Sequence, residues 1–403
     1  MTRILVLNSD TDGVFYFRIF PNLLINEPDI HVDLRFLNDW TLQLLNPNFL
    51  QNYQIIIYNK SIPFVNKETE DNFYNLCTSL GIKIIYDIDD NYILESSHPN
   101  YKKWKDSNAK ETVENSIKRA AYVTTTTELF AERLRLVNKN VAVIPNAINP
   151  SEKQWVSNKP PSDKIRFLWG GGISHIVDLR LLRDEFKKLD KKFLEETKMI
   201  MCGYDLRMKM NDGSIMKDDD ARSQWKHFED IFTNNGIYIK SHVYQKYLLS
   251  SNNMDNDTNY GRNTEFINEF YQRRHTKPIF LFGTMYNEAD ITIAPLKSDN
   301  MFNYCKSQLK LIESGVHHCP IIMSNYGPYT IDDIEGKRDG IQKGWLVDEK
   351  GGNDWYAKMK WYTMNKSAIR EHGEACYEYV MSKYSMDVVM KDRLALYREV
   401  ASM

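Results

Sequence analysis

The stretch Glu288–Pro328, EADITIAPLKSDNMFNYCKSQLKLIESGVHHCPIIMSNYGP, sets the pattern for the second half of the chain. Ile291–Ala294 is a short apolar run of the kind that a buried parallel strand makes. After a polar loop, the apolar spacing predicts a helix over about Cys305–Ser314, ended by Gly315. Ile321–Met323 is the next expected strand. Strand, helix and strand in this order indicate an α/β fold.

Polar side chains gather where this expected helix begins. Asn303, Lys306 and Ser307 lie at its first turn, where free backbone N–H groups and the helix dipole favour an anion. Lys306, Lys310 and Glu313 are spaced i, i+4 and i+7, so they would share one helical face. The pattern suits a phosphate at the helix start and a ribose held by Glu313. The alternative is an ordinary solvated Lys310–Glu313 pair on a surface helix.

Strand and helix signals alternate along both halves of the chain. In the first half, strands are expected at Ile4–Leu7, Ile55–Tyr58, Lys83–Tyr86, Tyr122–Thr125 and Val141–Ile144, with helices near 15–25, 66–80, 108–121 and 128–137. After the Pro-rich linker 159–163, strands are expected at Ile165–Trp169, Met199–Cys202, Ile291–Ala294, Ile321–Met323 and Trp345–Val347, with a helix at 179–189. The predicted fold is therefore α/β, with two Rossmann-like domains facing a central cleft and ligands at the carboxyl ends of the strands.

Two other regions depart from this alternation. Residues 205–275 read as an insertion in the second domain, with amphipathic patterns near 223–234 and 264–271 and a polar loop at 250–259. The tail has apolar residues at helical spacing over 354–365, 366–382 and 386–403, which predicts three helices.

The composition indicates a soluble protein of the cytoplasm. The chain has 403 residues and a net charge of −2, which gives no overall attraction to nucleic acid or membranes. Its five cysteines are widely spaced and form no CxxC, which is typical of reduced thiols. The amino terminus turns polar too early for a signal peptide, and no apolar run is long enough for a transmembrane helix.

Two glycine loops follow strands and are candidate ligand loops. Gly170-Gly171-Gly172 leads to His175 and a helix that starts near Asp178, where backbone N–H groups could hold phosphate. His175 would be a cation there only when protonated. Asp12-Gly13 follows the first strand, with Arg18 shortly after it. Both loops could also be plain turns; they lack the GxGxxG of a nicotinamide site.

Asp87-Ile88-Asp89-Asp90 also ends an expected strand and leaves three readings open. The carboxylates could hold a divalent metal as a DxD motif, face a sugar or acceptor without metal, or belong to a structural loop. Clustered carboxylates raise one another's pKa, so one of them could act as a base.

Other charged clusters carry weaker signals. His317-His318-Cys319 lacks metal-ligand spacing, so no metal site is expected. Arg273-Arg274-His275 and the lysine pairs at 187–188 and 191–192 could touch a nucleic-acid backbone, but solvated helix faces are the commoner use.

The stretch around Glu313 resembles the nucleotide-binding segment of retaining glycosyltransferases of family four, which have the two-Rossmann GT-B fold. The closer likeness is to a branch found in phages and bacteria, through APL at 294–296, FN at 302–303, KSQLK at 306–310 and Glu313. GGG at 170–172 with His175 and Asp178, and the GPY turn at 327–329, resemble the same branch. The family usually has two Glu eight residues apart; Glu313 matches the second, but Cys305 stands at the first.

The resemblance implies metal-independent transfer from a nucleoside-diphosphate sugar, UDP- or GDP-linked, with retention at the anomeric carbon. It implies a first domain over 1–158 joined by a returning C-terminal helix over about 384–403, and a nucleotide-sugar domain over 163–383. Donor contacts would come from Asp12, Gly13, Gly171, Gly172, His175, Asn303, Lys306, Ser307 and Glu313. Lys306, Asp89, Asp90 and Arg18 would carry the chemistry, with the last three on the acceptor side.

The acceptor and two further function classes stay open. A glycan or lipid-linked glycan is the favoured acceptor, and a modified DNA base is the alternative. A sugar-nucleotide 2-epimerase would share the two-domain shape and need no acceptor. A non-catalytic sugar-nucleotide-binding protein is favoured by Cys305 in place of the family's first Glu.

Overall fold

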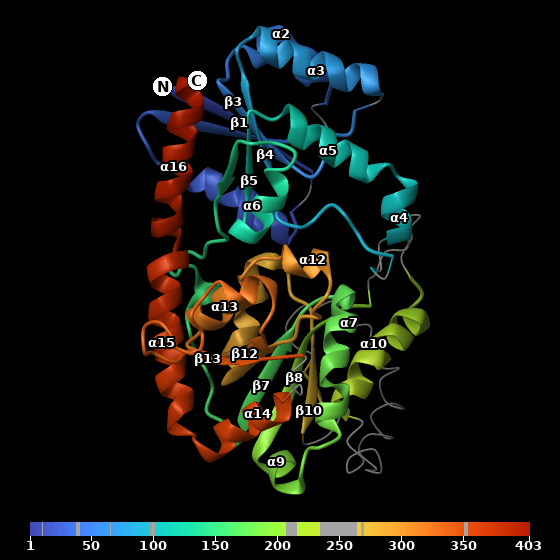
Figure 1. The fold of residues 1–403 in the computed structure, drawn as a ribbon, viewed down its shortest axis with the longest axis vertical. Coiled ribbons are helices and arrows are strands. Elements are labelled where there is room, and N and C mark those ends of the chain that lie inside the picture. The colour runs from blue at the N-terminus through green and yellow to red at the C-terminus, as the bar shows by residue number, and fades with distance from the viewer. Residues whose placement is uncertain are drawn as a thin grey trace. The chain divides into compact units, whose positions relative to one another are not determined.

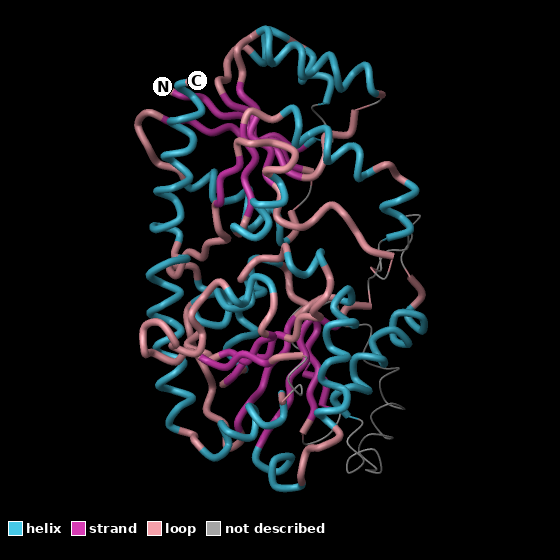
Figure 2. Tube along the Cα trace, viewed as in Figure 1, coloured by secondary structure: helices cyan, strands magenta, loops and turns pink. Residues whose placement is uncertain are grey.

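The computed structural model describes residues 1–403 apart from 10, 38–40, 65, 97, 99–100, 207–215, 234–263, 267–269 and 350–353. The chain divides into two compact units. The first holds residues 1–149, 304–308 and 383–403, and the second holds 150–303 and 309–382. Each unit is built on one sheet with helices packed on it (Figure 1; Figure 2). Residues 304–308, inside the stretch that resembles the nucleotide-binding segment, therefore group with the first unit.

The first unit contains a six-stranded, fully parallel sheet in the order β2-β1-β3-β4-β5-β6. Its strands are β1 (Thr2–Asn8), β2 (Ile30–Phe36), β3 (Ile55–Asn59), β4 (Lys83–Asp87), β5 (Tyr122–Thr125) and β6 (Val141–Val143). The sequence pattern missed β2, because this edge strand is half-exposed along most of its length and lacks the apolar run of its neighbours.

The C-terminal helix α16 (Met386–Ser402) belongs to the first unit, as expected. Its Val389, Leu396 and Val400 pack into one core with strand residues such as Ile4 and Ile57. The other helices are α2 (Pro47–Leu50), α3 (Lys67–Ser79), α4 (Tyr101–Asp106), α5 (Ala109–Arg119) and α6 (Glu128–Leu134). The helix expected over 15–25 is instead a π-helical turn, Phe15–Ile19, followed by a 3-10 helix, Phe20–Leu24, which has Pro21 in its first turn.

The second unit contains a seven-stranded sheet in the order β13-β12-β11-β7-β8-β10-β9. Its strands are β7 (Ile165–Gly170), β8 (Thr197–Tyr204), β9 (Thr264–Phe266), β10 (Tyr271–His275), β11 (Ile291–Ala294), β12 (Ile321–Ser324) and β13 (Gly344–Val347). All pairs are parallel except β10 with β9. The amphipathic pattern near 264–271 thus falls on strand residues at both ends, where β9 pairs with β10 and β10 pairs with β8.

The helices of the second unit cover this sheet. They are α7 (Ile176–Leu179), α8 (Arg183–Phe186), α9 (Lys191–Glu196), α10 (Asp218–Thr233), α12 (Met301–Tyr304), α13 (Leu309–Val316), α14 (Trp355–Met364) and α15 (Ser367–Tyr384). Trp225, Phe228 and Phe232 of α10 are buried in the main core, so this part of the expected insertion is integral to the unit. The polar loop expected at 250–259 lies outside the described residues. The helix expected at 179–189 is broken into α7, a 3-10 turn and α8.

The expected helix Cys305–Ser314 begins four residues late. Residues 305–308 are not helical, and α13 runs from Leu309 to Val316. Gly315 does not end it; a Cβ on Gly315 would lie 2.5 Å from Val380 and 2.9 Å from the Cys376 carbonyl oxygen. The glycine is therefore required by the close approach of α15 to α13.

None of the helices in the described part of the chain is both long and apolar enough to cross a membrane.

Candidate functional site

Asp178 on α7 connects two loops at the carboxyl edge of the second sheet. Its Oδ1 accepts hydrogen bonds from the Lys297 backbone N–H and from Asn303 Nδ2, both at 2.8 Å. Its Oδ2 lies 2.9 Å from His175 Nδ1. The side chain is 3% exposed. One buried carboxylate thus fixes both the loop after β7 and the loop after β11. Within the loop after β11, Asn303 Nδ2 also donates to the Lys297 carbonyl.

The glycine loop after β7 lies close to the next strand. Gly171 N–H donates to the Cys202 carbonyl at 3.1 Å, and Gly203 has a φ of +114°. A Cβ on Gly203 would lie 2.0 Å from the Gly171 carbonyl oxygen. Gly203 is therefore the residue that lets β8 pass under this loop. A Cβ on Gly172 would meet no atom within 4 Å, so one side of the loop has open space beside it.

Glu313 sits in the interior of the second unit. It is 1% exposed, and its Oε2 accepts from Tyr286 Oη at 2.6 Å and from Lys310 Nζ at 2.9 Å. The pKa of Tyr286 is raised well above its usual value, mainly by burial and next by the charge of the Glu313 carboxylate. The Tyr286 hydroxyl therefore keeps its proton and stays a donor. The Lys310–Glu313 pair is therefore not the solvated surface pair that the alternative interpretation assumed. Lys310, half-buried, is the accessible member of the pair.

Arg18 is buried under the carboxyl edge of the first sheet. Its Nε and Nη2 donate to the two oxygens of Asp87 at 3.0 and 2.6 Å, and Nη1 donates to the Ile144 carbonyl. Thr124 Oγ1 donates to Asp87 at 2.7 Å. Burial alone would lower the pKa of Arg18, but Asp87, together with Asp89 and Tyr397, more than offsets burial, and the pKa is raised. Arg18 is 1% exposed, so it holds β4 and β6 together and does not reach solvent.

The two carboxylates after Asp87 have different surroundings. Asp89 is half-buried and Asp90 is exposed. Burial, followed by the charges of Asp90 and Asp87, raises the pKa of Asp89 to about 7. Asp89 therefore has the proton affinity that a general base needs near neutral pH. Asp87, in contrast, has both carboxylate oxygens bonded by Arg18 and Thr124.

Asp12 and Gly13 begin the first helical segment of the chain. Asp12 Oδ1 accepts from the Phe15 N–H at 3.1 Å, as an N-cap does, and Oδ2 lies 2.7 Å from Lys60 Nζ. Asp12 is half-exposed. The structural role of a capping residue accounts for its contacts, and the ion pair places Lys60 at the same edge of the sheet.

Residues 304–308 carry Lys306 and Ser307 within the first unit. Asn146 Nδ2 donates to Ser307 Oγ at 3.1 Å, and Gln308 Nε2 donates to Tyr384 Oη at 3.3 Å. Cys305 is fully buried, and burial raises the pKa of its thiol to about 11. The expected placement of Lys306 on a helix face with Lys310 and Glu313 is wrong, because these side-chain bonds hold the segment out of a helix.

The other charged clusters have structural partners. Arg273 of β10 is buried against Glu229 at 3.2 Å and over the ring of Tyr204. Arg274 pairs with Glu288 at 2.6 Å. Within the described residues, no group of three His, Cys, Asp or Glu side chains is placed to hold a metal ion.

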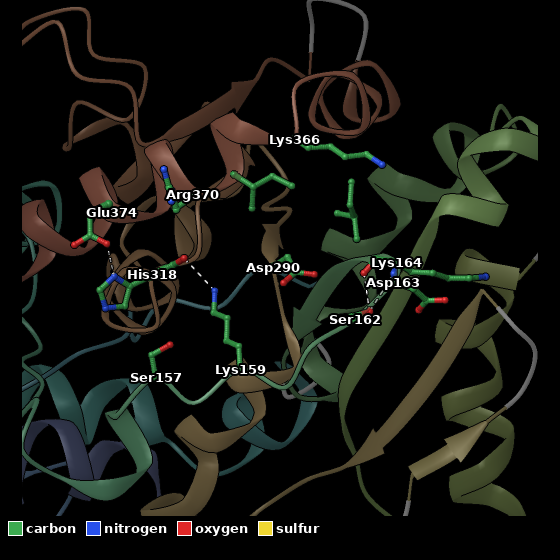
Figure 3. Close-up of a pocket in the computed structure, with 12 residues that line it drawn as sticks. Ser157, Lys159, Ser162, Asp163, Lys164, Asp290, His318, Lys366, Arg370 and Glu374 are labelled. Carbon is green, nitrogen blue, oxygen red and sulfur yellow. Dashed lines mark hydrogen bonds and ion pairs between the residues drawn. The ribbon is translucent and has the colours of Figure 1, made fainter.

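A pocket of about 520 Å³ lies at the opposite, amino-terminal edge of the second sheet (Figure 3). It is lined by the linker, with Lys159 and Lys164, by Asp290 before β11, and by Lys366 and Arg370 at the start of α15. Lys159 Nζ donates to the His318 carbonyl at 3.0 Å. None of the residues predicted as site residues lines this pocket, so it is separate from the carboxyl edges described above.

No protein-family profile and no curated protein sequence matches the chain. Solved structures do match it over its whole length. A crystal structure of Anabaena HepE with UDP and glucose aligns with a TM-score of 0.60 and 10% identity, covering 100% of both chains. Sucrose-phosphate synthase from Thermosynechococcus elongatus aligns with a TM-score of 0.65 and 12% identity, again covering 100% of both. An α,α-trehalose 6-phosphate synthase from Burkholderia multivorans covers 100% of this chain and 97% of that one, with a TM-score of 0.57 and 9% identity.

These matches establish the fold as GT-B-like, as predicted from the sequence. Among the predicted donor residues, the structure connects His175 and Asn303 through Asp178, and places Gly171 and Gly172 in the same loop region. Lys306 and Ser307 belong to the other unit. Sequence reasoning noted Asp178 as a helix start and as part of the segment that resembles the branch, but missed its bonds to Lys297 and Asn303, which lie 119 and 125 positions away.

Proposed function

We propose that the protein is a glycosyltransferase that transfers a sugar from a nucleoside-diphosphate sugar to a hydroxyl-bearing acceptor. The observation that carries this proposal is the Asp178 network, which orders two loops at the strand ends of a sheet in a GT-B-like fold. Ligands of open α/β sheets bind at these strand ends. HepE, which has this fold at full length, was crystallised with UDP and glucose.

On the donor side, the loop Gly171–Gly172 offers the backbone N–H of Gly172 beside open space, which suits a diphosphate, while the Gly171 N–H is bonded to Cys202. His175, aligned by Asp178, adds a donor or a positive charge. The Lys310–Glu313 pair is the proposed ribose contact, with Tyr286 fixing the carboxylate. That Lys306 acts on the leaving diphosphate, and that the sugar is transferred with retention as in glycosyltransferases of family four, stay predictions from the sequence.

On the acceptor side, Asp89 is the proposed base. Its raised pKa, about 7, lets it take a proton from a hydroxyl at neutral pH. Arg18 is a positioning residue, because it fixes Asp87 and with it the direction of the chain that carries Asp89 and Asp90. The protein needs no metal in this account, since helix N-termini and side-chain cations supply the positive charge.

Calorimetry with UDP, GDP and their hexose conjugates, in EDTA, tests the donor assignment. We expect one nucleoside diphosphate to bind, and Glu313→Gln to weaken its binding by about tenfold or more, the value of one charge-assisted hydrogen bond. Glu195→Gln is the matched control, because Glu195 also pairs with a lysine on a helix, at 3.6 Å, but is exposed on the surface of α9. Equal affinity of the Glu313 variant and the wild type would remove Glu313 from the donor site.

A second candidate is a protein that binds a sugar nucleotide without transferring the sugar. Cys305 favours it, since this position holds a buried thiol with a raised pKa where the resembled family has a carboxylate. Donor binding without nucleotide release, with every acceptor offered, would support this candidate over transfer.

A further inference from the structure

Of the buried polar side chains at the carboxyl edge of the first sheet that have no hydrogen-bond partner, two flank the aspartate segment. They are Asn59, at the end of β3, and Thr126, just after β5. Asn59 is 3% exposed and neither atom of its amide is bonded; Thr126 is fully buried and its hydroxyl is unbonded. An unsatisfied buried polar group costs about 1–3 kcal/mol, so proteins keep few of them. Two at the ligand edge of an α/β sheet indicate groups that a ligand satisfies.

The strand register places these side chains on either side of the aspartate segment. Asn59 pairs with Asp87 across β3 and β4, and Asp87 pairs with Thr124 across β4 and β5. Neighbouring residues in a parallel register point to the same face of the sheet. Thr126 follows Thr124 by two residues, the spacing that returns a side chain to the same side of an extended chain. Asn59 and Thr126 therefore flank the strand that leads to Asp89 and Asp90.

Thr125, which lies between Thr124 and Thr126 in the chain, gives an internal comparison. Thr125 is also fully buried with an unbonded hydroxyl. Because successive side chains of a strand alternate, Thr125 points to the opposite face of the sheet from Thr124. It is a matched control for Thr126, with the same residue type, the same burial and the adjacent place in the chain.

The charges at this edge disfavour an anionic ligand. Two of the aspartates are neutralised by cations, Asp12 by Lys60 and Asp87 by Arg18. Asp89 and Asp90 are adjacent in the chain. Neither Asp89 nor Asp90 forms an ion pair with another described residue.

One cation offsets part of this charge. Arg133 of α6 and Asp90 both act on the pKa of the Cys305 thiol, so both lie near it, although burial is the larger cause of that raised pKa. Above about pH 7, where Asp89 is ionised, the formal charges of Asp89, Asp90 and Arg133 sum to one net negative charge. A phosphate brought to this edge would be repelled by two carboxylates and attracted by one guanidinium.

We propose that Asn59 and Thr126 bind hydroxyl groups of the acceptor, and that the acceptor is a neutral, polyhydroxylated compound and not a phosphorylated or nucleic-acid one. This inference rests on the proposed glycosyltransferase function. An amide offers two donors and an acceptor, and a threonine hydroxyl offers both, which matches vicinal sugar hydroxyls. Asp89 and Asp90 accept from further hydroxyls and exclude anions, which extends selectivity to charge as well as shape.

Three variants test the side-chain assignment. Asn59→Leu and Thr126→Val remove the unbonded polar atoms at nearly constant volume, so each is expected to keep or raise Tm. Both should raise the KM for a neutral acceptor, chosen from a panel of methyl hexosides, by at least about tenfold. The affinity for the sugar nucleotide, measured by calorimetry without acceptor, should stay within about twofold of wild type. Thr125→Val should change neither. Acceptor KM values unchanged in Asn59→Leu and Thr126→Val would overturn the assignment.

A pair of acceptors tests the charge assignment. The best methyl hexoside is compared with its 6-phosphate, and a single-stranded oligonucleotide is included. The neutral compound should have the highest kcat/KM, independent of salt, whereas that of the phosphate should be at least tenfold lower and should rise with ionic strength as repulsion is screened. A preferred phosphorylated acceptor or oligonucleotide would overturn the inference. A protein that neither binds nor hydrolyses any sugar nucleotide would instead overturn the proposed function.

Discussion

Replacing Asp178 by alanine tests whether one buried carboxylate holds the two donor-side loops. Asp178→Ala leaves the Lys297 N–H, the Asn303 amide and His175 Nδ1 without the partner they share at 2.8–2.9 Å. Hydrogen bonds to a charged acceptor contribute about 1.5–3 kcal/mol each, and water entering the space of the lost carboxylate recovers part of this. We expect a loss of roughly 3 kcal/mol in the free energy of unfolding, which lowers Tm by about 6–12 °C for a unit of this size.

Asp178→Asn should be milder, at about 1 kcal/mol or less, because the amide oxygen can still accept from Lys297 and Asn303 while its NH₂ donates to neutral His175. Asp184→Ala is the surface control; its carboxylate is 79% exposed and pairs with Lys187 at 2.8 Å, so its effect should stay within about 0.5 kcal/mol. Urea unfolding gives the stabilities, and calorimetry with the best nucleotide gives donor affinity, which should fall in Asp178→Ala and largely persist in Asp178→Asn. An alanine variant as stable as Asp184→Ala, with wild-type donor affinity, would refute the reasoning.

Four other outcomes follow from the same geometry. Gly203→Ala should cost about 3 kcal/mol or more in urea unfolding, since its Cβ would lie 2.0 Å from the Gly171 carbonyl at a φ of +114°; a loss below 1 kcal/mol would contradict that contact. Burial, and secondly the charge of Lys159, lowers the pKa of His317 to about 3, from 6.5 in the unfolded chain. The unfolded chain therefore takes up the proton first as the pH falls, and the free energy of unfolding decreases below about pH 6.5. At about pH 4.5, His317→Phe should remove about 2–3 kcal/mol of this decrease in the free energy of unfolding. Parallel plots of unfolding free energy against pH for the variant and the wild type would refute this. Asp89→Asn should raise the unfolding free energy near pH 8 but not near pH 3, because the raised pKa, about 7, makes the carboxylate costly only above its unfolded value of 3.8. In the same variant, a turnover that still rises through about pH 7 would show that another group is the base.

Elements with strong local signals were predictable from the sequence. β11 has the expected bounds, Ile291–Ala294, because its apolar run is buried on both faces. α3 begins one residue after Asn66, whose side chain accepts from the Thr69 N–H as an N-cap. Both signals lie within a few residues of the element itself, so a single sequence contains them.

The errors come from partners that are far away in the chain. Ser307 bonds Asn146, which is 161 positions away, and this contact helps keep the start of the expected helix unwound. Arg18 is expected from the sequence on the acceptor side of the site, but Asp87, 69 positions later, holds its side chain in the core. The sequence predicts Asp178 at a helix start, and in the structure its carboxylate bonds residues of two loops. Side-chain pairings of this length follow from the assembled sheet, and no local pattern records them.

Transfer of a labelled sugar tests the central claim most directly. The donor found by calorimetry is prepared with a ¹³C-labelled sugar and incubated with the protein, the best neutral acceptor and EDTA, and the anomeric signals are followed by NMR. The account predicts a labelled glycoside with the anomeric configuration of the donor, formed in step with an equal amount of nucleoside diphosphate. A labelled free sugar with an inverted C2 centre and no glycoside, or a donor left intact with every acceptor, would contradict it.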